Sequence, residues 1–199
     1  MFDLVNKQPR KTSLAYIPTA SNVVPGHKDW LLDDFNKTYT LGLKSFDIVD
    51  ISAISKEKWL PRLQEADILM LGGGNTFHLM HWIRKSGLEE ILPELLKTKI
   101  YVGISAGSQI TNPRVDVSLQ NNLFEREENE YSVKKGLNYV NFYTVPHYQS
   151  KWFPKLTKEN VERNSKDIDF PVYALDDSSA VVVSENKINV VSEGNWIKV

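Results

Sequence analysis

The chain has 199 residues and a nearly balanced charge, with 24 Lys and Arg against 25 Asp and Glu. Its 41% of hydrophobic residues suits a globular protein with a sizeable core, and its net charge of −1 argues against general nucleic-acid binding, which usually needs a basic excess. Because the sequence has no Cys, it excludes disulfides, thiolate metal sites and a Cys nucleophile.

The first ten residues lack the apolar run of a signal peptide. No later stretch reaches the ~18 apolar residues that a membrane span needs. We therefore expect a soluble cytoplasmic protein with no membrane partner, folded as one domain over residues 1–199.

Short apolar runs alternate with amphipathic stretches over the first hundred residues. We expect strands at residues 13–17, 46–51, 67–71 and 100–104, and helices at residues 30–39, 56–66, 76–86 and 88–97. Buried strands that alternate with amphipathic helices are typical of βαβ units, which build a parallel sheet.

The pattern changes after Ser105, where residues 112–130 are polar and irregular. Further on, we expect a helix at residues 156–166 and short strands at residues 140–145, 172–175, 180–183 and 187–191. The sequence therefore predicts a three-layer α/β/α sandwich with a mostly parallel sheet and C-terminal antiparallel strands.

The segment from Gly103 to Gly107 reads G-I-S-A-G and matches the G-x-S-x-G pattern of a nucleophile elbow. It lies where a predicted strand ends and a helix should begin, as the elbow requires. The tight turn would lift the Ser105 hydroxyl above the sheet edge, and the N–H of Ala106 would face an oxyanion. The alternative is a purely structural turn in which Ser105 caps the helix.

A second glycine-rich segment, G-G-G-N-T at residues 72–76, also follows a predicted strand and precedes a helix. A dinucleotide fingerprint would need Gly at position 77, where the chain has Phe77, and no Walker-type Lys follows. The segment can instead donate backbone N–H groups to a developing oxyanion, with Gly74 and Asn75 as candidates for substrate contact. A structural glycine turn remains the other interpretation.

A Ser nucleophile needs a base, and the chain has four His residues. His147 follows the predicted strand 140–145, so it lies at the sheet edge where α/β active sites form. His78 and His81 share one helix face but have no acidic partner at metal-ligand spacing, so we expect no metal site. His147 is the best candidate for the base.

Several acidic residues could orient the base, and the sequence leaves the choice open. Asp116 lies in the irregular segment after the elbow, Glu125 opens an acidic run, and Asp176-Asp177 ends a late strand. Gln120 is also near but supplies no charge.

These motifs together resemble the peptidase E (aspartyl dipeptidase) and cyanophycinase family of serine peptidases. The matching segments occur in the family's order: I-P-T-A-S at 17–21, G-G-G-N-T-F at 72–77, G-I-S-A-G at 103–107 and P-H-Y at 146–148. The resemblance implies a flavodoxin-like fold of the class I glutamine-amidotransferase type, with Ser in place of Cys.

The resemblance also implies residue roles, with Ser105 as nucleophile, His147 as base, and the N–H groups of Gly73 and Ala106 as oxyanion donors. In peptidase E an Asp follows the nucleophile by a short loop and orients the His. Counted without gaps, that position is Gln120 here. Either a gap brings Asp116 or Glu125 into register, or the catalytic triad is incomplete.

The implied activity is hydrolysis of small peptides with an N-terminal Asp, through a covalent acyl-enzyme and without a cofactor or metal. Recognition of the Asp side chain needs a cation, for which Arg114 is the first candidate and Lys134 and Lys151 are others. We expect a monomer or small homo-oligomer whose partner is a small peptide substrate. The alternative function is a weakened or non-catalytic homologue that acts as a small-molecule or peptide-binding module.

Overall fold

The computed structural model describes residues 2–115, 117–124, 135–185 and 187–199. The chain divides into two compact units, Met1–Ser108 and Gln109–Val199, and each is described by itself. The expectation of one domain over residues 1–199 stays a prediction.

The first unit contains a parallel four-stranded sheet with the strand order β2-β1-β3-β4. Its strands are β1 (Ser13–Ile17), β2 (Ser45–Ile48), β3 (Ile68–Leu71) and β4 (Ile100–Gly103). In register, Ala15 pairs with Leu69, and Leu69 pairs with Tyr101. All four strands were expected near these positions, and their carboxyl ends meet at one edge of the sheet, where active sites of α/β proteins form.

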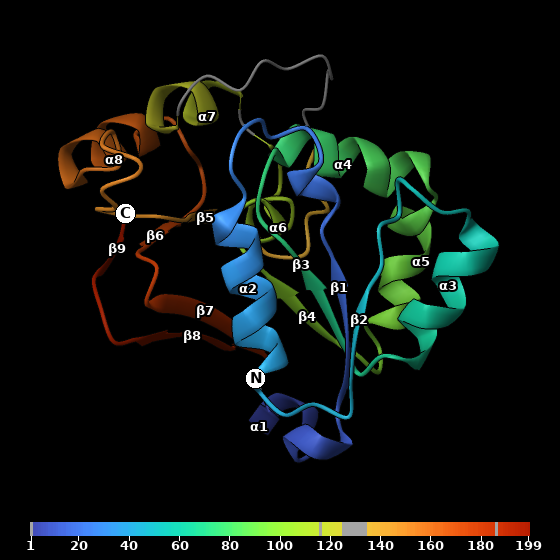
Figure 1. Ribbon diagram of the computed structural model, residues 1–199. Coiled ribbons are helices and arrows are strands. Elements are labelled where there is room, and N and C mark those ends of the chain that lie inside the picture. The colour runs from blue at the N-terminus through green and yellow to red at the C-terminus, as the bar shows by residue number, and fades with distance from the viewer. Residues whose placement is uncertain (1, 116, 125–134, 186) are drawn as a thin grey trace. The chain divides into compact units, whose positions relative to one another are not determined.

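Helices connect these strands and cover the sheet. They are α1 (Phe2–Val5), α2 (Asp29–Tyr39), α3 (Lys56–Glu65), α4 (Thr76–Lys85), α5 (Leu88–Leu95) and α6 (Ala106–Gln109), with 3-10 turns at Pro9–Lys11 and Thr19–Ser21. Figure 1 shows α2 on one face of the sheet and α3 and α5 on the other. Gly87 separates α4 from α5 with a left-handed φ of 77°.

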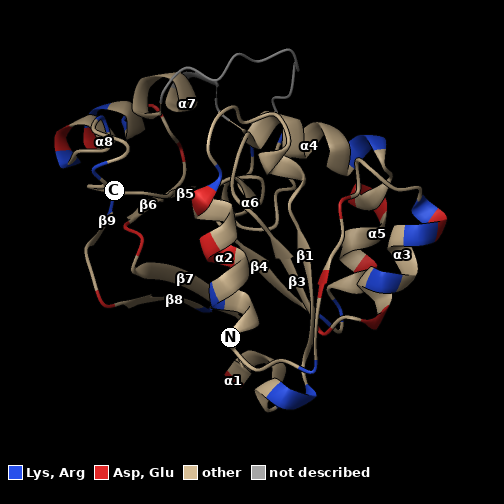
Figure 2. Ribbon diagram, in the orientation of Figure 1, with Lys and Arg blue, Asp and Glu red and all other residues tan. Residues whose placement is uncertain are grey.

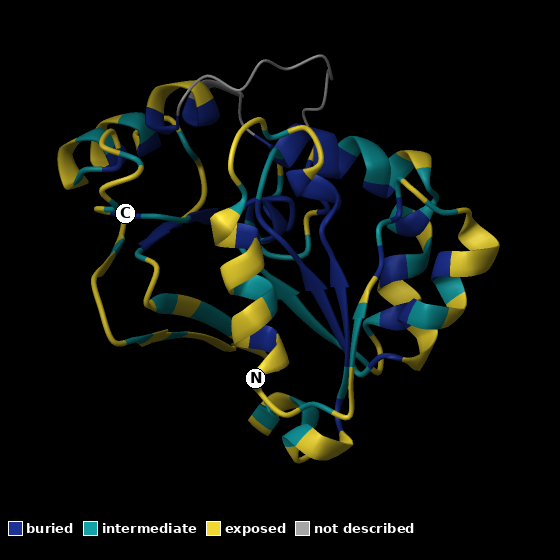
Figure 3. Ribbon diagram, in the orientation of Figure 1, coloured by how far each residue is buried: buried dark blue, intermediate teal, exposed yellow. Residues whose placement is uncertain are grey.

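The core of the first unit follows from the alternation of side chains along its strands. Leu14 and Tyr16 of β1 point to the same face as Met70 of β3 and pack with Leu31 of α2. Phe35 of α2 contacts the Tyr16 ring edge to face, with centroids 4.9 Å apart. Figure 3 shows β3 buried along its length and β1 buried over most of it, which explains why their runs of apolar residues predicted them well.

The second unit has a three-stranded sheet with the order β5-β6-β9 and a separate two-stranded ribbon, β7-β8. Its elements are α7 (Val117–Leu123), β5 (Tyr143–Val145), α8 (Lys158–Ser165), β6 (Val172–Leu175), β7 (Ser179–Ser184), β8 (Lys187–Ser192) and β9 (Trp196–Lys198). Strands β5 and β6 are parallel, whereas β9 and the ribbon are antiparallel. The predicted fold class, a mostly parallel α/β fold with C-terminal antiparallel strands, is confirmed.

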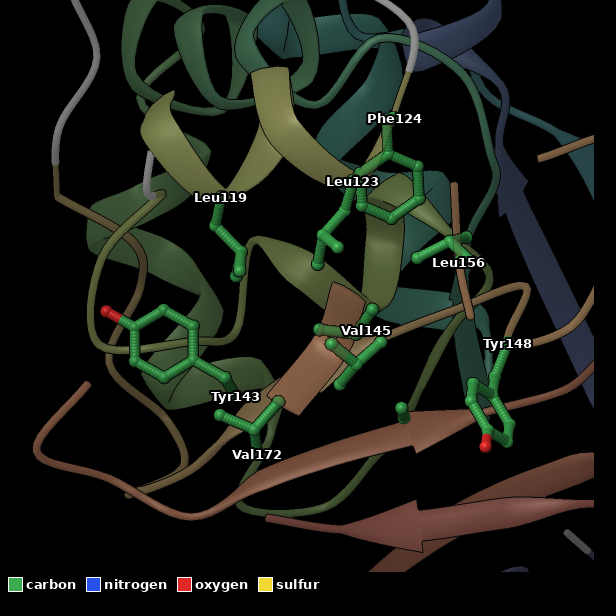
Figure 4. Close-up of a cluster of buried hydrophobic side chains, with 10 residues drawn as sticks. Leu119, Leu123, Phe124, Tyr143, Val145, Tyr148, Leu156 and Val172 are labelled. Carbon is green, nitrogen blue, oxygen red and sulfur yellow. The ribbon is translucent and has the colours of Figure 1, made fainter. Parts of the chain in front are cut away.

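The second unit has its own apolar core, which Figure 4 shows. Leu119 and Leu123 of α7 point toward Val145 of β5 and Val172 of β6. All four side chains are almost fully buried. This packing holds α7 over the pair β5-β6.

Charged side chains lie on the helices and loops of the first unit and are nearly absent from its sheet. In Figure 2, Lys, Arg, Asp and Glu colour α2, α3 and α5, while β1, β3 and β4 carry none. Within the described part of the chain, no helix combines the length and apolar character required to cross a membrane.

Candidate active site

Ser105 lies two residues beyond the end of β4 and has a left-handed backbone, with φ of 49°. Residues other than Gly rarely adopt this backbone conformation, which indicates local strain. Two backbone hydrogen bonds close the turn: the Gly107 N–H donates to the Ile104 carbonyl, and the Ser108 N–H donates to the Ser105 carbonyl, both at 2.9 Å. This strand–turn–helix arrangement is the one that a nucleophile elbow requires.

The two glycines of the elbow motif stand where no side chain would fit. A methyl group on Gly103 would lie 2.6 Å from the carbonyl oxygen of Gly107. A methyl group on Gly107 would lie 2.1 Å from the carbonyl oxygen of Leu71, at the end of the neighbouring strand β3. The glycines therefore allow α6 to begin directly at the strand ends.

Each glycine of the loop after β3 has a neighbouring group close to its backbone. A methyl group would lie 2.4 Å from the Tyr16 hydroxyl oxygen at Gly72, and 2.3 Å from the Ala20 carbonyl oxygen at Gly74, which also has φ of 132°. At Gly73 it would lie 3.3 Å from Cβ of Ser105. The Gly73 backbone thus runs beside the candidate nucleophile, a position suited to an oxyanion donor.

The Tyr16 side chain packs against this loop at Gly72 and is fully buried. Burial, together with the Asp34 carboxylate, raises the pKa of the Tyr16 hydroxyl above its ordinary value. The hydroxyl therefore stays protonated and donates a 3.1 Å hydrogen bond to Asp34.

Trp30 also lies beside Gly73, although its sequence pattern indicated only an apolar helix position. Its ring atom Cζ3 is 3.6 Å from the methyl position on Gly73 that lies near Ser105. The residue stands at the start of α2 and remains 37% exposed. Nothing in the sequence indicated this position of Trp30, because helical periodicity does not show which distant segments lie near the start of a helix.

Asn75 has a structural contact in this loop. Its side-chain oxygen accepts a 2.7 Å hydrogen bond from the His78 N–H and caps the N-terminus of α4. Its own N–H donates to the Ala20 carbonyl at 2.8 Å. Substrate contact by Asn75 and Gly74 stays a prediction.

His147 lies just beyond β5 in the second unit, and it also has a left-handed backbone, with φ of 64°. Its Nδ1 is 2.6 Å from Oδ1 of Asp177. The imidazole stacks on the Phe153 ring, with centroids 4.6 Å apart and planes inclined by 18°. The His147 side chain is 23% exposed and that of Asp177 60% exposed.

The parallel pairing of β5 and β6 explains why these two residues meet. Val145 pairs with Ala174, and beyond the strands the Tyr148 N–H donates to the Leu175 carbonyl at 2.9 Å. His147 and Asp177 therefore follow neighbouring strands at the same edge.

The other member of the acidic pair, Asp176, is bound to its own turn. It accepts hydrogen bonds from the Ser178 N–H at 3.0 Å, the Ser179 hydroxyl at 2.6 Å and the Asn195 N–H. Although burial acts in the opposite direction, these donors hold the pKa of Asp176 below its ordinary value. Asp176 thus stabilises the turn that carries Asp177.

The structure shows no hydrogen bond with His147 for the remaining candidates for the orienting acid among the residues that it describes. Asp116 and Glu125 lie outside the described residues. Gln120 belongs to α7 and is only 6% exposed. Their roles stay predictions.

The candidate cations for the substrate carboxylate have different contacts. Arg114 donates a 2.9 Å hydrogen bond from Nε to the hydroxyl of Tyr143, which is fully buried. Lys151 lies over the Trp152 ring, 4.8 Å from its centroid. Lys134 lies outside the described residues. Substrate binding by Arg114 stays a prediction.

His78 and His81 of α4 both have lowered pKa values. Burial is the main cause for each, and His81 adds to it for His78, while Lys85 adds to it for His81. Within the described ranges, no cluster of three or more His, Asp or Glu side chains could hold a metal ion.

Comparison with known proteins identifies the family of the chain. The profile of peptidase family S51 matches residues 1–191. An uncharacterised peptidase of Pasteurella multocida is 28% identical over 180 residues, which cover 88% of this chain and 84% of that protein. Peptidase E of a Nostoc species is 27% identical over 152 residues, which cover 73% of this chain and 59% of that protein.

Solved structures agree with the sequence comparison. A crystal structure assigned as a peptidase E protein of Listeria monocytogenes has a TM-score of 0.81 and 25% identity, covering 97% of this chain and 92% of that one. A peptidase from an acI-B1 Actinobacterium has a TM-score of 0.64 at 14% identity, which shows the shared fold alone. From its motifs, its fold and this match over nearly its whole length, the chain belongs to peptidase family S51.

Proposed function

We propose that this protein is a serine exopeptidase that hydrolyses dipeptides with an N-terminal Asp. The observation that carries the proposal is the strained turn at Ser105, which lies beside the backbone of Gly73. A serine held in this way has its hydroxyl exposed for attack and a backbone donor close to the reacting carbonyl.

The proposed reaction proceeds in two steps. The Ser105 Oγ attacks the carbonyl carbon of the peptide bond while His147 Nε2 takes the hydroxyl proton. The oxyanion accepts hydrogen bonds from the N–H groups of Gly73 and Ala106, and the protonated His147 then gives its proton to the leaving amine. Water, activated by His147, hydrolyses the resulting acyl-enzyme and releases Ser105.

Substrate choice depends on charge. An N-terminal Asp presents an α-ammonium and a β-carboxylate, and each needs a partner of opposite charge. We propose Arg114 as the cation for the carboxylate, with Gly74 and Asn75 in contact with the peptide. An Asn-X dipeptide lacks this carboxylate charge, so we expect it to be hydrolysed more slowly than the matching Asp-X dipeptide.

The test combines hydrolysis of Asp-Leu and Asn-Leu with labelling by a serine-reactive phosphonate. The wild-type protein should gain one phosphonate adduct and prefer Asp-Leu, whereas Ser105→Ala should lose both the adduct and hydrolysis. Ser184→Ala removes an exposed hydroxyl at the end of β7 and is the matched control, which should behave as wild type.

Three outcomes count against the proposal. Hydrolysis by Ser105→Ala within tenfold of wild type would exclude the serine mechanism. Equal rates on Asp-Leu and Asn-Leu would exclude the Asp specificity. A wild-type protein that neither hydrolyses nor takes the label would favour the alternative, a peptide-binding module without catalysis.

A further inference from the structure

We infer that Asp177 is the residue that positions His147, in place of an acid from the segment that follows the nucleophile. The inference deepens the proposed function and rests on it for its catalytic meaning. Its structural basis is the short 2.6 Å separation of His147 Nδ1 and Asp177 Oδ1, which makes this a hydrogen bond to a carboxylate.

This contact selects one form of the imidazole. An ionised carboxylate only accepts hydrogen bonds, so Nδ1 of His147 must carry the proton that lies between them. A neutral imidazole has a single N–H, and Nε2 therefore keeps its lone pair. A base that takes the proton of a serine needs this tautomer.

The backbone conformation of His147 and one further contact hold its ring in place. Its left-handed backbone fixes where the side chain leaves the chain, and the near-parallel stack on Phe153 fixes the plane of the ring. With Asp177 at Nδ1, rotation about the last side-chain bond would break the hydrogen bond and the stack together. The imidazole is thus preorganised before substrate arrives.

The carboxylate of Asp177 is itself delivered by a well-bonded turn. Asp176 binds Ser178, Ser179 and Asn195, so the turn between β6 and β7 is tied to the chain just before β9. Gly194 makes room for this, because a methyl group there would lie 2.0 Å from Oδ2 of Asp176. Asp176 therefore has a structural role and Asp177 a positioning role.

The assignment removes the need for a charge at position 120. Gln120 occupies the place where an ungapped count puts the acid of peptidase E, and it cannot accept as a carboxylate does. With Asp177 bonded to His147, a buried amide on α7 is compatible with a working base.

The first measurement reads the tautomer directly and needs no activity. In full-length protein with ¹⁵N-labelled His, the wild type should show His147 protonated at Nδ1, with its signals assigned by their loss in His147→Gln. Asp177→Asn should shift His147 toward protonation at Nε2, because an amide can donate to Nδ1. Asp177→Glu keeps a carboxylate and should retain the Nδ1-protonated form.

The second measurement is hydrolysis of Asp-Leu by the same variants. Replacing the orienting Asp of a Ser-His-Asp enzyme lowers kcat by about 10⁴, so Asp177→Asn should lose on the order of 10³–10⁴ in kcat with a smaller change in KM. Asp177→Glu should recover part of the loss. Asp169→Asn removes an exposed charge from the same unit and is the matched control, expected to match wild type in both measurements.

The two measurements separate the inference from the proposed function. An unchanged His147 tautomer in Asp177→Asn overturns the inference, and so does full activity of that variant. Loss of activity in Asp116→Asn or Glu125→Gln, with Asp177→Asn still active, would assign the acid to Asp116 or Glu125 and leave the serine mechanism standing. A tautomer shift in a protein without peptidase activity would support the positioning contact and refute the proposed function.

Discussion

Ser105 and His147 share an uncommon backbone, with φ of 49° and 64°. For a residue other than Gly, such a conformation costs of order 1–3 kcal/mol and persists only when its surroundings enforce it. At Ser105 the turn hydrogen bonds and the flanking glycines enforce it, and at His147 the contacts with Asp177 and Phe153 accompany it. Both residues of the proposed proton transfer are therefore held by their neighbours and not by their own preferences.

Gly107 should tolerate no side chain, because a methyl group there would lie 2.1 Å from the Leu71 carbonyl oxygen. Relieving this overlap requires the turn to move, and overpacking of this kind typically costs about 1–3 kcal/mol. We expect Gly107→Ala to lower the thermal unfolding midpoint and to abolish phosphonate labelling of Ser105.

Gly26→Ala is the control for this prediction. Gly26 has φ of 82° but open space around its methyl position, so the variant measures the cost of the left-handed backbone alone. It should lose some stability and keep full labelling. Normal labelling of Gly107→Ala would show that the elbow does not depend on that glycine.

At the scale of elements, helix starts and strand ends carry the candidate residues of each unit. Strands β3 and β4 end at the glycine loop and the elbow, and β5 and β6 end just before His147 and Asp177. Helix α2 contributes Trp30, whose ring lies beside Gly73 and remains partly exposed. A partly exposed aromatic ring beside the glycine loop would offer an apolar wall to a bound peptide.

Truncation of this wall should weaken catalysis. We expect Trp30→Ala to lower kcat/KM for Asp-Leu roughly five- to tenfold, as loss of about 1–1.4 kcal/mol of aromatic contact would do. Trp30→Phe should keep most of the activity. Trp152, which is 72% exposed, provides the control Trp152→Ala. Equal kinetics for Trp30→Ala and wild type would place the peptide elsewhere.

Element patterns in the sequence predicted most of the fold. Strand β3 is buried along its whole length and β1 from Leu14 onward, so their apolar composition identified them without a partner strand. Strand β9, with three residues, was missed because it is too short to show a period, and its pairing with β6 fixes it instead. The strand predicted at 140–145 is shorter in the structure, where β5 covers only Tyr143–Val145.

The site was only partly predictable. The elbow and His147 stand at strand ends that the sequence located, whereas the choice among acidic residues depended on contacts between distant segments. Asp177 meets His147 because β5 and β6 pair in one register, and a sequence count shows no such register. Trp30 could not be found, since Gly73, beside which its ring lies, is more than forty residues away.

At the scale of the whole molecule, the proposed mechanism draws on both compact units. Ser105 and Gly73 belong to Met1–Ser108, while His147 and Asp177 belong to Gln109–Val199. Each half has its own sheet and its own apolar core. If the halves form one catalytic device, removing a member from either unit should disable the same step.

This expectation can be tested by combining variants. Members of one catalytic unit are strongly non-additive, because the first loss already stops the shared step. We expect His147→Ala to reduce kcat as much as Ser105→Ala, and the double variant to be no worse than either alone. His78→Ala and His81→Ala remove imidazoles from α4 and should keep most activity, provided that their folding is verified by circular dichroism. Losses that multiply in the double variant would show that Ser105 and His147 act independently, and a dispensable His147 would assign the base to another residue.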